Sequence, residues 1–245
     1  MDFGLEGKRV LVTGSAGGCG LEIAKILIQE RASVILHGSP AREEKLKQLQ
    51  AEIGAAGYVL GDLSKEEDVE ALWKDAGEVD ILVNNAGVWP TAYVREMQTD
   101  DFRRTLDINL VAPFILSRNF VNQRIEQGKK GKIINLVSQA AFHGSTSGHA
   151  HYAASKAGLV AFTVSLAREA APYGIHVNAV APGMMRTPMN EQALAEREDE
   201  YIARIPLRRI ADASEVANVV CFLASELSDY MTGATVDVSG GMLMR

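Results

Sequence analysis

The sequence has little that would place the protein outside the cell or within a membrane. Its 245 residues include two cysteines, Cys19 and Cys221, too few for a disulfide-rich secreted domain. We predict two buried, reduced thiols, with a redox-sensitive Cys19 as the alternative. No apolar run approaches the roughly 18 residues of a membrane-spanning helix. The first residues lack the basic and apolar segments of a secretory signal. We therefore expect a cytoplasmic protein with no membrane partner.

Positive charge is scarce as well. The chain has 25 lysines and arginines against 31 aspartates and glutamates, a formal net charge of -6 at pH 7. With no basic stripe, this composition argues against a nucleic-acid partner. The length suffices for a large α/β core, and 47% of the residues are hydrophobic. No linker, repeat or composition shift divides the chain, so we expect one domain over residues 1–245.

Short β-branched segments alternate with longer amphipathic segments along the chain. Segments 81–83 and 133–137 are too continuously apolar for strands that bury one face, so they indicate a sheet covered on both sides. The alternation predicts an α/β fold, a doubly wound parallel sheet of the Rossmann type with about seven strands and helices on both faces. The predicted strands are 8–13, 33–37, 58–61, 80–84, 132–137, 176–180 and 235–238. The predicted helices are 20–29, 42–53, one starting near 65, one or two within 101–127, 152–171 and 214–225.

Two segments carry local predictions. Ser64 precedes the helix expected near residue 65, and Glu67 follows it by three residues, which predicts a capping box. Segment 184–208 is polar and irregular in pattern. We interpret it as a mobile flap over the substrate, with an ordinary surface insertion as the alternative.

Tyr152 and Lys156 are the most informative pair in the chain. Four residues apart on a helix, a phenol and an ammonium emerge on one face, one turn apart. The pair follows Ser138 and a loop rich in glycine and serine. A neighbouring ammonium favours the phenolate and lowers a phenol pKa from about 10, which suits a tyrosine that exchanges a proton with a substrate oxygen. The alternative is an ordinary amphipathic helix face.

A glycine-rich turn follows the first predicted strand. Residues 13–20 read TGSAGGCG, which lets the backbone approach a pyrophosphate and opens a helix whose free N–H groups attract that anion. An ordinary turn is the alternative. We expect a nicotinamide dinucleotide to bind here, with contacts from Gly14, Ser15, Gly18, Cys19 and Gly20.

The end of the second predicted strand favours NADP(H) over NAD(H). An NAD site usually places a carboxylate near this point, where it binds the ribose hydroxyls and repels a 2′-phosphate. No acidic residue occurs between Glu30 and Glu43. Instead Gly38 leaves space, Ser39 offers a hydroxyl and Arg42 offers a positive charge. A solvated Arg42 with only a slight cofactor preference is the alternative.

Two later strand ends complete the expected cofactor site. Asp62 ends the third strand within reach of an adenine amino group. The NNAG segment, residues 84–87, ends the fourth strand, where side-chain amides brace the backbone around a cofactor. The residues assigned to cofactor binding in these two places are Asp62, Leu63, Asn85, Ala86 and Gly87.

Together these motifs resemble the short-chain dehydrogenase/reductase family over residues 7–241. Beyond the glycine loop and NNAG, the resemblance rests on Asn109, Ser138, the Tyr152–Lys156 pair, Pro182-Gly183 and Thr187. It implies an oxidoreductase that interconverts a ketone and a secondary alcohol by hydride transfer. The resemblance implies that Tyr152 acts as the general acid or base and that Ser138 bonds to the substrate oxygen. It implies that Lys156 holds the nicotinamide ribose and lowers the pKa of Tyr152, while Asn109 supports a relay water. The nicotinamide carboxamide would be contacted by Pro182, Gly183 and Thr187.

The chain departs from the family pattern at three points. Cys19 stands where an aliphatic residue is common, and Gly17 stands where many NADP enzymes have a basic residue. Ser138 and Tyr152 are fourteen residues apart, one more than the commonest spacing. The extra residue falls in the loop 144–149, which we expect to line the substrate cleft.

Three histidines, His143, His149 and His151, surround this loop. A metal site needs ligands that converge in a defined geometry, and nothing else in the sequence suggests one, so we predict no metal. The roles of the three rings stay open. His149 or His151 contacts the substrate, or all three are exposed loop residues.

Among relatives the chain most resembles 3-oxoacyl-(acyl-carrier-protein) reductases, on the segments 230–235 (YMTGAT) and 240–242 (GGM). An acidic carrier protein would need basic residues beside the cleft, and Lys129, Lys130 and Lys132 are candidates. A secondary alcohol, sugar or polyol dehydrogenase of the same family is the alternative. A catalytically silent regulatory protein that binds NAD(P) is a remote one. The family also implies a homo-oligomer, a tetramer or dimer, and the helix 152–171 offers Leu159, Val160, Phe162 and Val164 for one interface.

Overall fold

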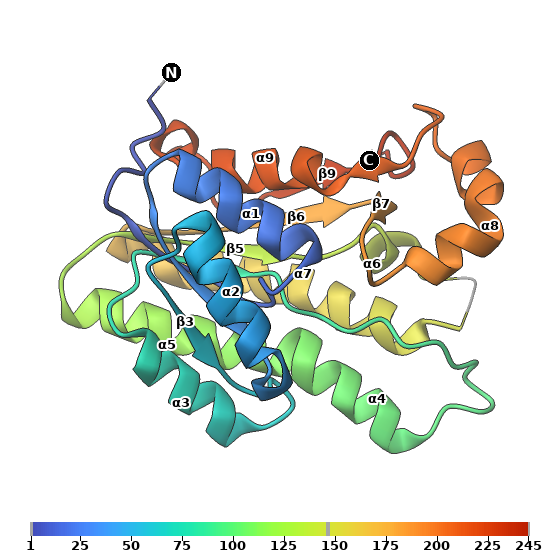
Figure 1. Cartoon of the computed structure of the whole chain (residues 1–245), viewed down its shortest axis with the longest axis horizontal. Helices are drawn as coiled ribbons and strands as arrows, with labels where there is room; N and C mark the ends of the chain where they lie inside the picture. Colours follow the sequence, from blue (N-terminus) through green and yellow to red (C-terminus); the bar gives the residue numbers. More distant parts are fainter. Residues whose placement is uncertain (1, 146–147, 245) are drawn as a thin grey trace.

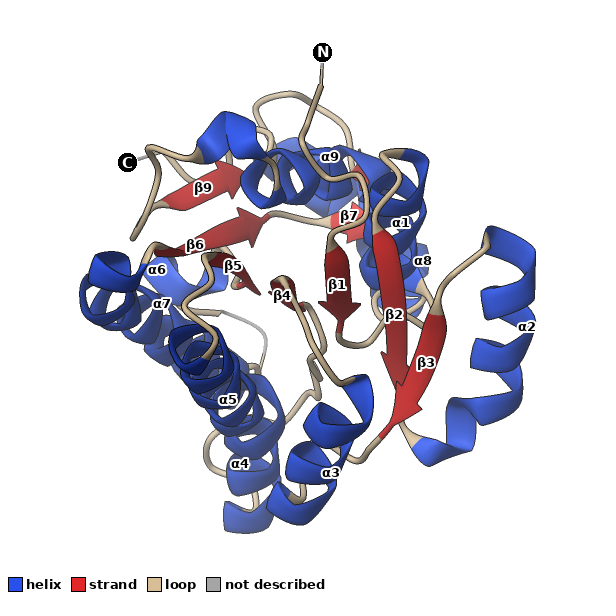
Figure 2. Ribbon diagram, turned by 90° about the vertical axis from the view of Figure 1, so that its left-hand side faces the viewer, coloured by secondary structure: helices blue, strands red, loops and turns tan. Residues whose placement is uncertain are grey.

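A sheet of seven parallel strands forms the centre of the computed structural model, which describes residues 2–145 and 148–244 (Figures 1 and 2). The strand order is β3-β2-β1-β4-β5-β6-β9, as expected for a doubly wound fold, and β7 and β8 form a separate parallel pair. The strands are β1 (Arg9–Val12), β2 (Ser33–Gly38), β3 (Gly57–Leu60), β4 (Ile81–Asn84), β5 (Gly131–Leu136), β6 (Ile175–Pro182), β7 (Met185–Arg186), β8 (Ala211–Asp212) and β9 (Thr235–Val238).

Helices cover both faces of this sheet (Figure 2). Side chains alternate between the two faces of a strand. Val10 and Val12 therefore pack with α1, α2 and α9, whereas Leu11 packs with α3, α5 and α7. The helices are α1 (Gly18–Gln29), α2 (Glu43–Ile53), α3 (Glu66–Ala76), α4 (Thr99–Leu106), α5 (Ala112–Glu126), α6 (Ala140–His143), α7 (Ala150–Ala170), α8 (Glu191–Arg204) and α9 (Ala213–Ala224).

The strand order fixes where a ligand would bind. From β1 the chain runs outward through β2 to β3, and then returns to β4 on the other side of β1. The connections that follow β1 and β4 lead to helices on opposite faces of the sheet, which leaves a crevice at the carboxyl ends of the strands, the usual ligand position in open α/β sheets.

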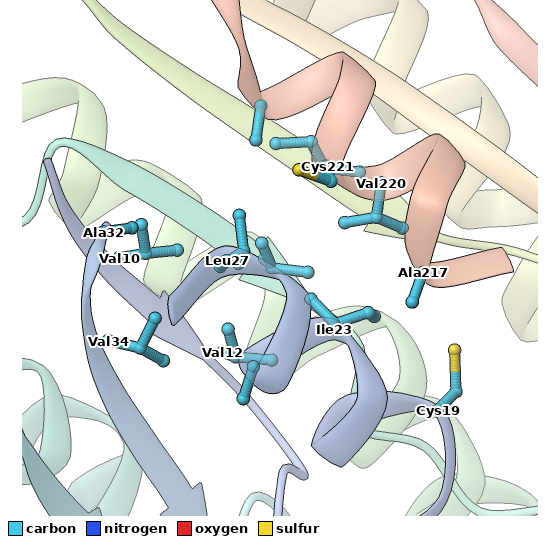
Figure 3. Close-up of a cluster of buried hydrophobic side chains, with 14 of the residues drawn as sticks. Val10, Val12, Cys19, Ile23, Leu27, Ala32, Val34, Ala217, Val220 and Cys221 are labelled. Atoms are coloured by element: carbon cyan, nitrogen blue, oxygen red, sulfur yellow. The ribbon is translucent and has the colours of Figure 1, made fainter. Parts of the chain in front are cut away.

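Both thiols lie in the core between the sheet and the pair α1 and α9 (Figure 3). Cys19 and Cys221 are free and buried, which confirms the predicted state of the two cysteines. Burial raises the pKa of Cys19 to about 12 and that of Cys221 to about 11. Since the thiolate is the reactive form, neither thiol has the electronic character of a redox sensor.

The capping box predicted at Ser64 was wrong. The α3 helix begins at Glu66 without a side-chain cap, because the Ser64 hydroxyl donates to Asp62 Oδ1 at 2.8 Å instead. A capping box stands at α9, where the Asp212 N–H donates to Glu215 Oε2 at 3.0 Å. Segment 184–208 is also more regular than its polar pattern indicated.

That segment contains β7 and the helix α8, which lies at one end of the molecule (Figure 1). Leu194 and Ile205 of this segment, together with Ile210 just beyond it, are buried at the centre of a separate small apolar cluster. The described part of the segment is therefore a packed subdomain beside the sheet, and its movement as a flap stays a prediction.

The α7 helix is the longest in the described part of the chain, yet none of the described helices is long and apolar enough to span a bilayer. Leu159 is fully buried on the inner face of α7, so its expected place in an interface between subunits was wrong. Val164 is 36% exposed, and Phe162 packs edge-on against Phe114 of α5 with ring centres 5.9 Å apart.

Candidate active site

A cavity of about 970 Å³ opens at the carboxyl ends of the strands. Most of the residues that the sequence predicted for the site line it, although they come from segments spread over the whole chain. These lining residues are Gly14, Gly18, Cys19, Gly20, Gly38, Ser39, Arg42, Asp62, Leu63, Asn85, Ala86, Gly87, Ser138, Tyr152, Lys156, Pro182, Gly183 and Thr187.

The glycine loop, residues 13–20, is pressed against the segment that follows β4. Gly14 has φ +66°, and a Cβ there would stand 2.8 Å from Ala86 Cα. A Cβ on Gly20 would stand 2.5 Å from Asn85 Nδ2. Only glycine fits these two positions, so the loop can close on the NNAG segment as it does.

The other side of the loop is open. Nothing lies within 4 Å of a Cβ built on Gly17, and α1 begins at Gly18 with no side-chain cap and no acidic residue in its first turn. Free N–H groups at such a helix start attract a phosphate. The glycine loop is therefore packed closely against the NNAG segment on one side and open on the other side, where a pyrophosphate would fit.

Ser15 is a correction to the predicted contacts. Its side chain is fully buried and does not line the cavity. The hydroxyl donates to Val12 O at 2.9 Å and accepts from the His37 N–H at 2.9 Å. Ser15 therefore braces the loop from behind.

His37 is a site residue that the sequence analysis missed. Its imidazole is 2% exposed and lies at the cavity wall, under the glycine loop. The Gly14 N–H donates to His37 Nδ1 at 3.0 Å, so Nε2 carries the hydrogen, which faces Gly61 O at 3.3 Å. Burial lowers the pKa of His37 to about 4, so the ring is neutral at physiological pH.

The ends of β2 and β3 form the side of the cavity that would face an adenosine. Gly38, Ser39 and Arg42 all line it, and the Arg42 side chain is exposed. Asp62 accepts hydrogen bonds from the N–H and hydroxyl of Ser64, which lower the pKa of Asp62. Arg104 of α4 also lines this side and donates to Ser64 Oγ at 2.8 Å, a second cation that the sequence did not reveal.

Tyr152 and Lys156 lie one turn apart on α7, as predicted, with Lys156 Nζ 5.9 Å from the centre of the phenol ring. A hydrogen bond joins Tyr152 to Ser138, so the extra residue between them leaves their geometry intact. Burial raises the pKa of Tyr152, against a smaller lowering by the Ser138 hydrogen bond. The upward shift prevails in the protein alone, and the expected lowering of this pKa by Lys156 stays a prediction.

Lys156 itself is almost completely buried. It is 4% exposed, and its ammonium donates to Leu136 O at 2.6 Å. Across residues 2–145 and 148–244, no carboxylate forms an ion pair with it. Burial lowers the pKa of Lys156 to about 8, so the cation is held beside the phenol at a cost in stability.

Asn109 lies behind the cavity wall, in a π-helical turn over Asp107–Val111 that joins α4 to α5. Its fully buried amide accepts from the Val88 N–H at 2.8 Å and donates to Val88 O and Ser155 Oγ. The amide thus ties the segment after β4 to α7, beside Lys156. Single π-turns often mark functional sites.

An aromatic pair stands near Tyr152. Trp89 lines the cavity and stacks on His149, with ring centres 4.2 Å apart and planes at 21°. His149 is 4% exposed, and its Nδ1 lies 2.8 Å from Pro90 O. The ring therefore supports Trp89 and is not an exposed loop residue. One sequence signal pointed to Trp89: it follows the NNAG segment with a single valine between them.

The other two histidines differ in exposure. His143 is exposed at the end of α6, whereas His151 is fully buried on α7 with neither ring nitrogen paired among the described residues. Burial lowers the pKa of His149 and that of His151. The loop 144–149 was expected to line the cleft, and its residues 146 and 147 lie outside the described residues.

The comparisons with known proteins agree with this geometry. Residues 14–243 match the family model described as enoyl-(acyl carrier protein) reductase. The chain is 41% identical to the 3-oxoacyl-[acyl-carrier-protein] reductase of Rickettsia felis, over 98% of each chain. It is 39% identical to nodulation protein G of Rhizobium sp. strain N33, over 99% of each.

Solved structures give the same fold. A gluconate 5-dehydrogenase from Burkholderia cenocepacia, in complex with NADP and tartrate, superposes with a TM-score of 0.90 at 31% identity, over 98% of this chain and 97% of that one. A short-chain dehydrogenase/reductase, glucose/ribitol dehydrogenase, from Brucella melitensis superposes with a TM-score of 0.92 at 33% identity over the whole of both chains. The protein is thus an NAD(P)-dependent oxidoreductase that belongs to the short-chain dehydrogenase/reductase family.

Proposed function

We propose that the protein reduces the keto group of 3-oxoacyl thioesters with NADPH, with Tyr152 as the proton donor. The observation that carries the substrate class is the lining of the cavity beyond β4, β5 and β6. The residues that line it after these strands include, with Ser138, the apolar side chains of Trp89, Met185 and Met189. Such a wall suits an acyl chain and its thioester.

The same wall lacks what a sugar acid would need. Within the described lining, Arg42 and Arg104 lie on the side of β2 and β3, so Lys156 is the sole cation beside Ser138. A buried carboxylate of a sugar acid would require a charged partner of its own, whereas the Lys156 ammonium already serves Leu136 O and the phenol of Tyr152. The names of relatives such as the Rickettsia felis reductase support the thioester assignment.

The residues of the chain divide the chemistry among them. The bound nicotinamide would supply the hydride. Tyr152, whose raised pKa keeps the phenol protonated at neutral pH, donates its proton to the substrate oxygen. Ser138 orients that oxygen, and the Lys156 ammonium stabilises the phenolate that remains. Asn109 is a positioning residue, because its amide holds Val88 and Ser155 rather than a ligand.

The prediction that three lysines beside the cleft bind an acidic carrier protein was wrong for a single chain. The amino end of β5 carries Lys129, Lys130 and Lys132, whereas the cavity lies at the carboxyl ends of the strands. Lys129 is paired with Glu78, and Lys132 is paired with Asp229 at 2.7 Å. The thioester class therefore rests on the cavity itself, and the carrier is left to experiment.

The test follows absorbance at 340 nm with NADPH and acetoacetyl-coenzyme A, a small 3-oxoacyl thioester. We expect NADPH oxidation that is saturable in thioester and faster than with NADH. The matched reaction uses NADP⁺ with gluconate or ribitol. Turnover of a polyol or sugar acid without thioester turnover would reject the proposal and favour the dehydrogenase activities named for the Burkholderia and Brucella structures.

Arg42 provides a separate prediction on the cofactor. We expect Arg42→Ala to weaken NADPH binding by about tenfold or more, because a charge-assisted hydrogen bond contributes about 1.5–3 kcal/mol. NADH binding should change little, since it has no 2′-phosphate. Equilibrium titration of both cofactors measures the effect. Lys47→Ala, on the exposed side of α2 away from the cavity, is the matched control. An equal loss for both cofactors would contradict the assigned role.

A further inference from the structure

The glycine loop has few internal means to hold its shape. Its small residues impose little conformational preference, and a loop that closes on a phosphate must have its N–H groups aimed before binding. In this protein a single residue links the loop after β1 by hydrogen bonds to β2 and to the end of β3. The residue that makes this connection, His37, has no role in the proposed reaction.

His37 contacts the loop through both its backbone and its ring. The Ser15 N–H donates to His37 O at 2.9 Å, and the His37 N–H donates to Ser15 Oγ at 2.9 Å. The imidazole then accepts from the Gly14 N–H and donates to Gly61 O at the end of β3. One side chain thus bridges the loop after β1 and the loop after β3, on opposite flanks of β2.

The bridge works only with a neutral ring. A protonated imidazole would carry hydrogens on both nitrogens, so Nδ1–H would face the Gly14 N–H and lose its role as acceptor. The charged groups on the surrounding segments are Arg42 after β2 and Asp62 and Asp68 after β3. Burial lowers the pKa of His37, against a smaller raising by the hydrogen bond to Gly61 O, and none of these charged groups contributes. No carboxylate therefore stands ready to stabilise an imidazolium there.

We propose that His37 is a positioning residue that holds the glycine loop in its cofactor-binding conformation, through the hydrogen bond that its Nδ1 accepts from Gly14. The effect should be the same for NADH and NADPH, because the loop faces the pyrophosphate that both share. The inference rests on dinucleotide binding in this cavity, and it is independent of the thioester substrate.

The test compares three variants of the whole protein by isothermal titration with NADPH and with NADH. His37→Phe keeps a ring of similar shape but leaves the Gly14 N–H without an acceptor, and we expect both dissociation constants to rise about tenfold. His37→Asn places an oxygen where Nδ1 stands, so its dissociation constants should stay within about threefold of wild type. At saturating cofactor, kcat should be unchanged in both.

Val34→Ala is the control for a loss of stability alone. Val34 is fully buried on β2, three residues before His37, and does not line the cavity. We expect Val34→Ala to lower the melting temperature and to leave both dissociation constants unchanged at 25 °C. A His37→Phe variant that destabilises the fold without weakening cofactor binding would overturn the proposal. Weakening confined to NADPH would overturn it as well.

A pH series supplies a readout independent of the cofactor. The folded pKa of His37, about 4, lies below its usual 6.5, so the unfolded chain takes up the proton first as the pH falls. Stability is therefore lost from about pH 6.5 toward pH 4. By pH 4, the unfolding constant of wild type should rise up to ~160-fold more than that of His37→Asn. Parallel acid profiles would show that the ring is not held neutral in the fold and would reject the argument.

The outcomes also separate this inference from the proposed function. Tenfold weaker binding of both cofactors to His37→Phe supports the inference even if no thioester is turned over. Wild-type protein that binds neither dinucleotide would overturn both.

Discussion

Replacing Tyr152 with phenylalanine should lower kcat for ketone reduction by about 10²- to 10⁴-fold, the usual contribution of a positioned general acid. The substitution removes one oxygen and keeps the ring, so α7 and the cavity should retain their packing. The dissociation constant for NADPH should stay within about twofold of wild type, because the lost atom faces the substrate oxygen. Steady-state kinetics and equilibrium titration on the same preparations measure the two quantities.

Tyr173→Phe is the matched control, since Tyr173 is 54% exposed just beyond α7 and does not line the cavity. Its kinetics should equal those of wild type. The raised pKa of Tyr152 adds a pH test. The phenol stays protonated through neutral pH, so kcat for reduction should be level from pH 6 to 7, below the pKa of Lys156 of about 8. Oxidation of an alcohol needs the phenolate and should accelerate as pH rises. Turnover by Tyr152→Phe within tenfold of wild type would reject the tyrosine as proton donor.

Replacing Lys156 with methionine should stabilise the protein and nearly abolish its activity. The ammonium is buried with one carbonyl partner, and its pKa of about 8 lies below the usual 10.5. A lysine whose folded pKa is depressed destabilises the fold below that pKa, and the penalty disappears above the unfolded pKa. At pH 7 this penalty corresponds to about 3 kcal/mol. Methionine removes the charge and keeps most of the volume.

The gain in folding stability will be smaller than this penalty of about 3 kcal/mol, because Leu136 O loses its hydrogen bond to the ammonium, which contributes about 1 kcal/mol. A net 1–2 kcal/mol should raise the melting temperature by roughly 2–4 °C per kcal/mol for a chain of this size. Activity should fall by about 10²-fold or more, since the phenolate left on Tyr152 loses its neighbouring cation. Calorimetry at pH 7 measures the change in melting temperature, and NADPH oxidation measures the loss of activity. Lys47→Met, on the exposed side of α2, should change neither. A lower melting temperature for Lys156→Met would contradict the argument.

Much of the fold followed from local patterns. The alternation of strands and helices, and the unbroken apolar runs of β4 and β5, predicted a parallel sheet covered on both faces, and the structure confirms it. The motif residues of the cavity were also predictable, because the glycine loop and the Tyr152–Lys156 pair are contiguous segments. The cap expected at Ser64 failed because Asp62, two residues away, offered the hydroxyl a nearer acceptor.

Other parts of the site depend on contacts between distant segments. His37 sits inside an apolar strand, and its importance arises from β2 lying between β1 and β3, which brings Gly14 and Gly61 to its two nitrogens. Trp89 gains its support from His149, sixty residues further along the chain. The pKa of Tyr152 likewise depends on how deeply the fold buries the phenol, which the spacing to Lys156 does not encode.

The π-turn that carries Asn109 has a consequence for the helices on either side of it. A turn closed by i→i+5 bonds holds one residue more than an α-turn, so the angular phase of the side chains advances by roughly 100° across it. The continuous rod from Thr99 to Glu126 therefore presents two different stripes. Thr105 is the buried residue of α4, whereas Phe120 and Leu116 face the sheet from α5. Deleting one residue within 107–111 would bring the two stripes into phase, turning α5 off its contact with the sheet or Asn109 away from Val88.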